Sequence, residues 1–194
     1  MDLYAEAVER FRELYERARA LDMPETSAMS LATVDADGRP SVRTVLLKAF
    51  DARGFVFYTN KLSRKGRALH ADPRAALCFL WQPLMEQVLV EGQVENVSVA
   101  ESDAYWATRV RISQIGAWAS QQSGEMADKG ELARCFAEYE LKFTDKPVPR
   151  PAHWAGFRLR PDSIEFWSSR PGRLHERERY SRVEGAWKHT WLFP

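Results

Sequence analysis

The chain is poor in cysteine and in long apolar runs, and both deficits exclude whole classes of protein. Cys78 and Cys135 are its two cysteines, so we expect buried free thiols and no disulfide framework or CxxC pair. No apolar run approaches the roughly 20 residues that a membrane-spanning helix requires. The first residues, Met1 to Glu6, lack the order of a secretory signal, a positive segment followed by a hydrophobic one. We therefore expect a soluble, cytoplasmic protein.

Strong net charge is also missing, as are the motifs of several enzyme classes. The chain has 28 Lys and Arg against 27 Asp and Glu, a net charge of +1, which argues against a broad nucleic-acid-binding surface. Neither GxGxxG, a P-loop, HExxH nor GxSxG occurs, so a Rossmann site, an NTPase, a zincin and an α/β-hydrolase lose support. His70, His153, His175 and His189 lack the spacing of metal ligands, and we expect no metal. Any basic site must be local, and the chemistry is expected from a bound cofactor.

Apolar periodicity and Gly-terminated turns predict a mostly β protein with flanking helices, an α+β fold. The predicted strands cover 28–34, 41–50, 55–59, 75–81, 87–98, 154–159, 163–167, 174–181 and 186–191. The predicted helices cover about 3–20, a short segment after Ser63, 100–107, 113–120 and 128–143. Five early strands in a meander suggest an antiparallel, Greek-key-like barrel. Because no linker is long enough to separate two domains, we expect one domain over 1–194, its barrel and later helices beginning near residue 28.

The segment Arg173–Arg177 is the most informative local pattern. In an extended strand Arg173, His175 and Arg177 project from the same face. Such a face suits an anionic, planar ligand, because guanidinium groups make bidentate contacts and stack on flat groups. The same pattern is typical of a solvated strand face on an antiparallel sheet. Trp167 offers a ring for stacking on a flat ligand, although buried tryptophans more often belong to a core.

A second basic segment begins the short predicted helix. Ser63 can cap this helix beside Arg64 and Lys65, and a helix N-terminus next to two cations favours phosphate. A capping serine followed by ordinary surface charges is the alternative. Arg43 and Lys48 lie in an otherwise apolar strand, where unpaired charge is costly. Five positions apart, they face opposite sides of an ideal strand and predict two separate anionic groups, unless a bulge realigns them.

A third cluster lies among the later helices. Tyr105, Arg109 and Ser113 are spaced by four and form one stripe if the helix is continuous. All three can donate hydrogen bonds to a phosphate, but a solvated helix face has the same spacing. Gln122 and Ser123 add uncharged donors at a helix end, or simply form a polar loop.

Seven motifs, taken in their order along the chain, resemble the pyridoxamine 5′-phosphate oxidase family. They are Arg43–Lys48, Phe57–Asn60, Ser63–Lys65, Ser113–Trp118, Gln122–Ser123, Ile164–Trp167 and Arg173–His175. The match runs from about Ala28 to the C-terminus. The resemblance implies an FMN-binding split barrel and a homodimer with sites at the subunit interface. It also implies oxidation of pyridoxamine or pyridoxine 5′-phosphate to pyridoxal 5′-phosphate, with O₂ reoxidising the flavin and H₂O₂ released.

The resemblance also implies a role for each residue. The family's FMN contacts correspond to Arg43, Thr44, Val45, Leu46, Leu47, Lys48, Tyr58, Thr59, Arg64, Lys65, Gln87, Gln122, Ser123, Trp167 and Arg177. Its substrate contacts correspond to Lys48, Tyr105, Arg109 and Ser113 around the phosphate, and to Arg173 and His175 against the pyridine ring. In the implied mechanism a hydride leaves the substrate's C4′ carbon for flavin N5. Arg173 and His175, the expected catalytic residues, hold the ring in a near-attack pose.

Two alternatives remain beside this interpretation. One is a related flavin oxidase that acts on another ring, such as the phenazine-pathway relatives. The other is a flavin or pyridoxal phosphate binding module without turnover. Retention of the six substrate contacts favours the vitamin B6 substrate, whereas Val110, Ile112 and Glu176 depart from the family's usual residues.

Overall fold

The computed structural model describes residues 2–194. Its helices are α1 (Leu3–Arg19), α2 (Arg64–Ala71), α3 (Val99–Thr108), α4 (Arg111–Ala119) and α5 (Glu131–Lys142), with short 3-10 turns η1 (Gln82–Leu84) and η2 (Pro171–Arg173). Its strands are β1 (Ala28–Val34), β2 (Pro40–Leu46), β3 (Ala49–Asp51), β4 (Gly54–Asn60), β5 (Arg74–Trp81), β6 (Glu86–Asn96), β7 (Trp154–Ser168), β8 (Glu176–Val183) and β9 (Ala186–Leu192).

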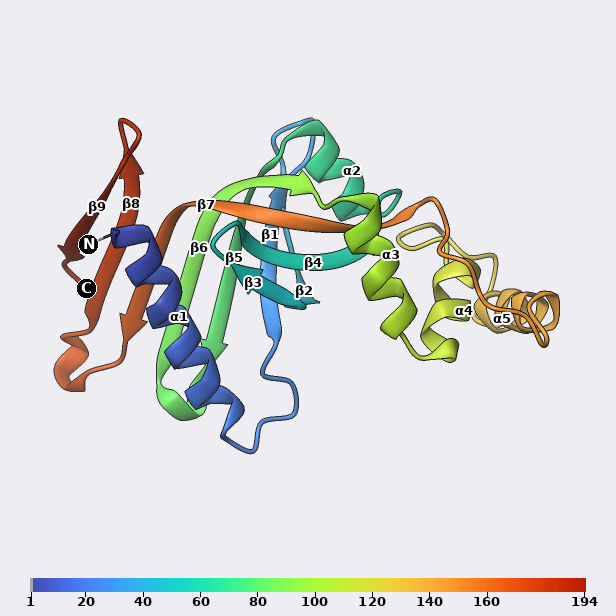
Figure 1. Cartoon of the computed structure of the whole chain (residues 1–194), viewed down its shortest axis with the longest axis horizontal. Coiled ribbons are helices and arrows are strands. Elements are labelled where there is room, and N and C mark those ends of the chain that lie inside the picture. The colour runs from blue at the N-terminus through green and yellow to red at the C-terminus, as the bar shows by residue number, and fades with distance from the viewer. Residues whose placement is uncertain (1) are drawn as a thin grey trace.

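The strands form one curled antiparallel sheet (Figure 1). Its path runs β2-β1-β5-β6-β7-β4-β3, and β8 and β9 continue from β7. β2 and β3 therefore lie at opposite ends of the path, yet only Leu47 and Lys48 separate them in the chain. The sheet must curl back on itself to satisfy both conditions. The expected single strand 41–50 and the expected meander are both wrong, because β5 pairs with β1 and β7 pairs with β4.

β7 is the central strand, and it replaces the two strands expected at 154–159 and 163–167. Its first part pairs with β4, its last part with β8, and β6 runs along most of its length. The register with β6 shifts between Glu91 and Gly92. A Cβ atom at Gly92 would lie 2.0 Å from the carbonyl oxygen of Arg160, so glycine permits the close approach that bends the two strands.

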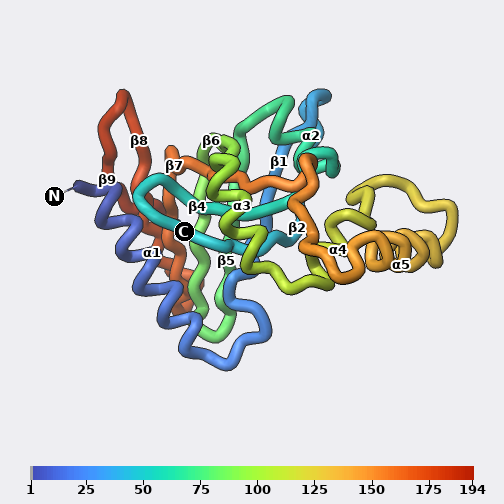
Figure 2. Tube along the Cα trace, turned by 45° about the vertical axis from the view of Figure 1, so that its right-hand side comes forward, coloured from blue at the N-terminus to red at the C-terminus, as the bar shows by residue number. Residues whose placement is uncertain are grey.

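The main core lies inside the curl and is covered by α1. Phe11 of α1 is fully buried, and its ring packs edge-on against Phe50 and Phe55 at centroid distances of 4.9 and 4.8 Å. A second, smaller cluster joins α3, α4 and α5 around Trp106 and Trp154. α4 and α5 lie at the end of the molecule opposite β8 and β9 (Figure 2).

Two sequence-based boundaries that affect the site are wrong. β8 begins at Glu176, because Arg170–Arg173 form a turn in which Gly172 and Arg173 have φ values of 68° and 62°. Arg173, His175 and Arg177 therefore do not lie on one continuous strand. The expected helical stripe through Arg109 is also broken, because Arg109 ends α3 with φ −74° and ψ 139°.

Within residues 2–194, no helix is long and apolar enough to cross a membrane. The expected cytoplasmic location stays a prediction. Cys78 and Cys135 are half-buried free thiols on β5 and α5.

Candidate functional site

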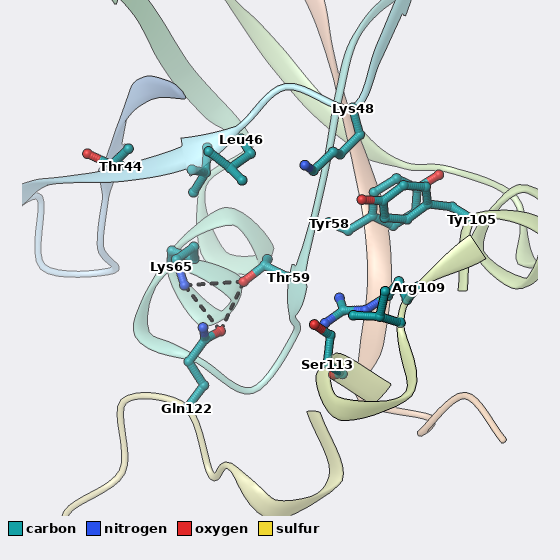
Figure 3. A pocket seen from close by; sticks show the side chains of 12 residues that line it. Thr44, Leu46, Lys48, Tyr58, Thr59, Lys65, Tyr105, Arg109, Ser113 and Gln122 are labelled. Atoms are coloured by element: carbon teal, nitrogen blue, oxygen red, sulfur yellow. Dashed lines mark hydrogen bonds between the residues drawn. The ribbon is translucent and has the colours of Figure 1, made fainter. Parts of the chain in front are cut away.

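A cavity of about 460 Å³ opens where the curled sheet meets α3 and α4 (Figure 3). It lies at the seam between β2 and β4, so residues from the strand edges and from both helices reach it. Its lining consists of Thr44, Val45, Leu46, Lys48, Tyr58, Thr59, Lys65, Tyr105, Arg109, Val110, Ser113 and Gln122. An adjoining cavity of about 360 Å³ shares Tyr58, Thr59, Arg109, Ser113 and Gln122 with it.

Lys65 provides a buried cation at one end of the cavity. Its side chain is 9% exposed, and Nζ lies 3.2 Å from both Thr59 Oγ1 and Gln122 Oε1. Thr59 Oγ1 in turn lies 3.0 Å from Gln122 Oε1 (Figure 3). Burial lowers the pKa of Lys65, and the nearby positive charge of Arg43 lowers it further. The ammonium group is thus held by neutral oxygens alone.

The surroundings of Lys65 add positive charge. Ser63 caps α2, since its Oγ accepts from Gly66 N at 3.2 Å. Arg43 turns toward β1 and donates to Thr33 Oγ1 at 2.7 Å, while burial and the charge of Arg64 lower the pKa of Arg43. Among the residues that the structure describes, no carboxylate forms an ion pair with these cations. A cluster of this kind favours an anionic ligand, because buried charge without a partner is costly.

A second group of donors occupies the other end of the same cavity. Arg109 is half-buried, and its Nη2 donates to Ser113 O at 2.9 Å. Tyr105 stacks on Tyr58 at 4.1 Å, and the amine of Lys48 points into the cavity beside these rings (Figure 3). The break between α3 and α4 still brings Tyr105, Arg109 and Ser113 together, because the extended backbone at Arg109 turns the chain around the cavity. Burial lowers the pKa of Arg109, which nevertheless remains a cation at neutral pH.

Three further predicted residues are cross-strand neighbours on β6, β7 and β8. Gln87 pairs with Trp167, and Trp167 pairs with Arg177. Arg177 Nε lies 2.8 Å from Glu165 Oε1, and its Nη1 donates to the carbonyl oxygen of Phe193 at 3.2 Å. Arg177 is therefore oriented by β7 and by the C-terminal segment.

His175 and Arg173 lie beside this group. The imidazole of His175 lies 4.6 Å from the ring of Trp167. The backbone N–H of Arg170 donates to His175 Nδ1 at 3.2 Å, so in the neutral ring the proton is on Nε2, which can donate to a ligand. The exposed Arg173 follows Gly172 in the turn and extends the set of donors.

The predicted site residues thus form two separate groups, one around the cavity beside α3 and α4 and the other on β6, β7, β8 and the turn before β8 (Figure 1). Four predicted residues lie outside both groups. Leu47 is 4% exposed in the main core, and Ser123 lines another cavity of about 200 Å³. Arg43 and Arg64 do not line the main cavity. The expectation that Arg43 and Lys48 face opposite sides of one strand does not apply, because the strand ends at Leu46.

The structure also shows residues whose position the sequence did not indicate. Val110 lines the cavity as the residue before α4. Ile112 is 67% exposed on the first turn of that helix. Glu176 pairs with Arg170 at 2.7 Å, which supports the turn that carries His175. No spacing rule connects these residues, since each depends on where a turn falls.

Comparisons with known proteins bear on the whole chain. Residues 14–143 match the family described as pyridoxamine 5′-phosphate oxidase, and residues 154–194 match its C-terminal dimerisation region. The chain is 57% identical over 187 residues to a pyridoxine/pyridoxamine 5′-phosphate oxidase of Myxococcus xanthus, covering 96% of this chain and 91% of that one. It is 54% identical to the protein of the same name in Alkalilimnicola ehrlichii, with full coverage of both.

Solved structures agree with this grouping. PhzG from Burkholderia lata, in complex with tetrahydrophenazine-1-carboxylic acid, is 34% identical with a TM-score of 0.88, covering 96% of this chain and 90% of that one. An FMN-binding protein from Nostoc punctiforme, 19% identical with a TM-score of 0.74 and 96% coverage of both chains, shares the fold. The expected fold class is confirmed, and the match to the dimerisation region supports the expected homodimer. The chain belongs to the pyridoxamine 5′-phosphate oxidase family of oxidoreductases, as its ordered motifs had indicated.

Proposed function

We propose that this protein is an FMN-dependent oxidase that converts pyridoxamine and pyridoxine 5′-phosphate to pyridoxal 5′-phosphate. Pyridoxine 5′-phosphate and O₂ would give pyridoxal 5′-phosphate and H₂O₂. The amine substrate also consumes water and releases ammonia. The observation that carries the proposal is the presence of two separate sets of phosphate donors in one cavity, which suits a cofactor phosphate and a substrate phosphate.

The first donor set fits the phosphate of FMN. Lys65 has neutral oxygens as its hydrogen-bond partners, and Arg43 and Arg64 add positive charge close by. A dianionic phosphate would supply the missing counter-charge, and the start of α2 would add its dipole. Riboflavin, which has no phosphate, would not satisfy these cations.

The second donor set fits the phosphate of the substrate. Arg109 offers a planar fork of N–H donors, and Lys48, Tyr105 and Ser113 add three further donors around the same space. A bound flavin supplies the two-electron chemistry, accepting a hydride and passing electrons to O₂. The role of the chain's own residues is to fix the substrate against that group, and orientation of this kind removes much of the entropic barrier.

We infer that the residues proposed to contact the substrate ring come from a second protomer. Arg173 and His175 belong to the segment before β8, and this segment lies far from the junction of α3 and α4, which carries Arg109 (Figure 1). They also lie within the dimerisation region, residues 154–194. We infer that each site takes its phosphate donors from one protomer, and Arg173, His175, Gln87, Trp167 and Arg177 from its partner. His175 would then donate from Nε2 to the substrate ring, while Arg173 holds the ring electrostatically.

The test is the release of peroxide from FMN-loaded protein on addition of pyridoxamine 5′-phosphate. We expect stoichiometric H₂O₂ and pyridoxal 5′-phosphate, and much weaker turnover of unphosphorylated pyridoxine. Tight binding of substrate without peroxide would identify a binding module instead of an enzyme.

A second candidate substrate is a phenazine-type ring acid, because 96% of this chain superposes on the PhzG structure. A carboxylate on a tricyclic ring makes less use of the four phosphate donors than a phosphate does. Faster turnover of tetrahydrophenazine-1-carboxylic acid than of either B6 phosphate would favour that candidate and reject ours.

A further inference from the structure

The ring of Trp154 packs against Arg109, one of the donors proposed for the substrate phosphate. Trp154 is the first residue of β7 and is 4% exposed. The guanidinium carbon of Arg109 lies 4.8 Å from the centroid of its ring. Its ring also stacks on Tyr58 at 5.1 Å and 12°, and lies nearly parallel to Tyr105 at 6.1 Å and 7°. One buried ring thus contacts Arg109 directly and supports both cavity tyrosines.

The contact of the Arg109 guanidinium with the ring of Trp154 leaves N–H donors of Arg109 available to an anion. A guanidinium group that packs its face on an aromatic ring keeps its N–H donors in the plane, pointing outward from the stack. Nη2 uses one of them on Ser113 O, at 2.9 Å. Nε is buried and has no hydrogen-bond partner among the described residues. A donor that is buried and unpaired is costly, so the site is arranged for a further acceptor.

Hydrogen bonds hold the backbone of Trp154 in place. The backbone N–H of Trp154 donates to Pro151 O at 3.0 Å, and Arg150 Nη1 donates to the backbone carbonyl oxygen of Trp154 at 2.8 Å. Two residues along, Gly156 pairs with Tyr58, and a Cβ atom there would lie 2.6 Å from the tyrosine ring. Gly156 therefore gives Tyr58 the space to stack on Trp154.

Resting on the proposed function, we propose that Trp154 is a positioning residue for the substrate phosphate. Its ring holds the guanidinium of Arg109 by a cation–π contact, and through Tyr58 it fixes the ring of Tyr105. Trp154 itself does not touch the phosphate. Without the ring of Trp154, the Arg109 side chain can rotate. Part of the binding free energy of the phosphate is then used to order the guanidinium group, and the affinity falls.

The experiment compares Trp154→Leu and Trp154→Phe with wild type, all FMN-loaded so that the cofactor phosphate site is filled. Equilibrium binding of pyridoxine 5′-phosphate is measured by calorimetry, beside KM and kcat for the same substrate. We expect Trp154→Leu to weaken binding and raise KM by about 5- to 30-fold, with kcat changed less than about threefold. Trp154→Phe retains an aromatic face and should recover most of the affinity.

Two controls separate positioning from general damage to the core. Trp118→Leu removes an aromatic ring from the same cluster, but Trp118 packs on Tyr139 and Phe143, so its substrate affinity should stay close to wild type. Unphosphorylated pyridoxine should bind Trp154→Leu and wild type equally weakly. An equal loss of affinity in both leucine variants, or no rescue by phenylalanine, would overturn the proposal.

The outcome also separates this inference from the proposed function. If wild type binds pyridoxine 5′-phosphate but releases no peroxide, the oxidase assignment is rejected, while the binding comparison still decides the role of Trp154. If wild type does not bind this ligand at all, both are rejected.

Discussion

At the scale of single residues, Lys65 combines a stability cost with the phosphate-binding role proposed for it. Its buried ammonium has neutral partners, and burial lowers its pKa. We expect Lys65→Met to leave the thermal stability of the apoprotein unchanged or higher, because the buried charge is removed. The same substitution should lower the affinity for FMN by roughly tenfold to a hundredfold, or about 1.5–3 kcal/mol of binding free energy. Fluorescence titration measures this, with riboflavin as the control that should not respond. Equal loss for FMN and riboflavin would contradict the phosphate role.

Arg173 and Arg177 should fail in different ways. Arg177 is held by Glu165 and lies beside Trp167, so Arg177→Ala should chiefly lower FMN retention. Arg173→Ala should leave FMN content near normal and reduce kcat/KM at least tenfold, about 1.5 kcal/mol or more. Arg173→Lys should restore this only in part, because a point charge cannot replace a planar fork. Flavin absorbance and steady-state kinetics on the same preparations test both predictions. An unchanged kcat/KM for Arg173→Ala would show that Arg173 is an ordinary surface residue with no role in turnover.

At the scale of elements, the start of α3 is joined to β7 by Glu101. Glu101 and Ser98 form a capping box, and Glu101 Oε1 lies 2.7 Å from Nη2 of the buried Arg158. The hydrogen bond from Arg158 is the largest cause that lowers the pKa of Glu101 from its ordinary value of 4.5. The carboxylate therefore stabilises the fold above about pH 4.5, and this contribution is lost as the pH falls through the lower, folded-state pKa.

We expect Glu101→Gln to destabilise the protein by roughly 1–3 kcal/mol at neutral pH, because Arg158 loses its charged partner. The difference from wild type should shrink as the pH falls below about 4.5, because the unfolded carboxyl protonates first and the folded one follows at its lower pKa. Urea denaturation of both proteins, at neutral pH and at a pH below about 4.5, measures the difference in the free energy of unfolding. A difference that stays constant with pH would show that lost packing, and not the charge, causes the effect. Tyr105 and Arg109 lie on the later part of the same helix and at its end, so substrate affinity should fall with stability.

At the scale of the whole molecule, the proposed sharing of each site between two protomers can be tested with hybrid dimers. Arg109→Ala and Arg173→Ala homodimers should each keep about a tenth of wild-type activity or less. When the two variants are unfolded and refolded together in equal amounts, half of the dimers are hybrids, and each hybrid carries one intact site. We expect recovery of about a quarter of wild-type activity. Peroxide release after refolding measures this, with each variant refolded alone as the control. No recovery, despite hybrid dimers seen by mass spectrometry, would place each site within one protomer.

The sequence by itself determined much of the local structure and the family. Gly-terminated turns marked the β1–β2 and β3–β4 hairpins, and the predicted helices lie within a few residues of those observed. These features depend on interactions between residues close in the chain, so a single sequence contains the information. The same holds for the Ser63 cap beside Lys65. The ordered motifs, read together, indicated the family without any contact being known.

Only the tertiary structure decided which strands pair and where the site lies. β2 and β3 separate to opposite ends of the sheet because strand pairing depends on burial over long sequence distances, and a local pattern does not encode it. The turn at Gly172 removes Arg173 from the strand face on which alternation had placed it. The sequence pattern did not indicate a role for Trp154 at the site, because a tryptophan that starts a strand is typical of a core. Its contact with Arg109 arises only when β7 packs against the end of α3.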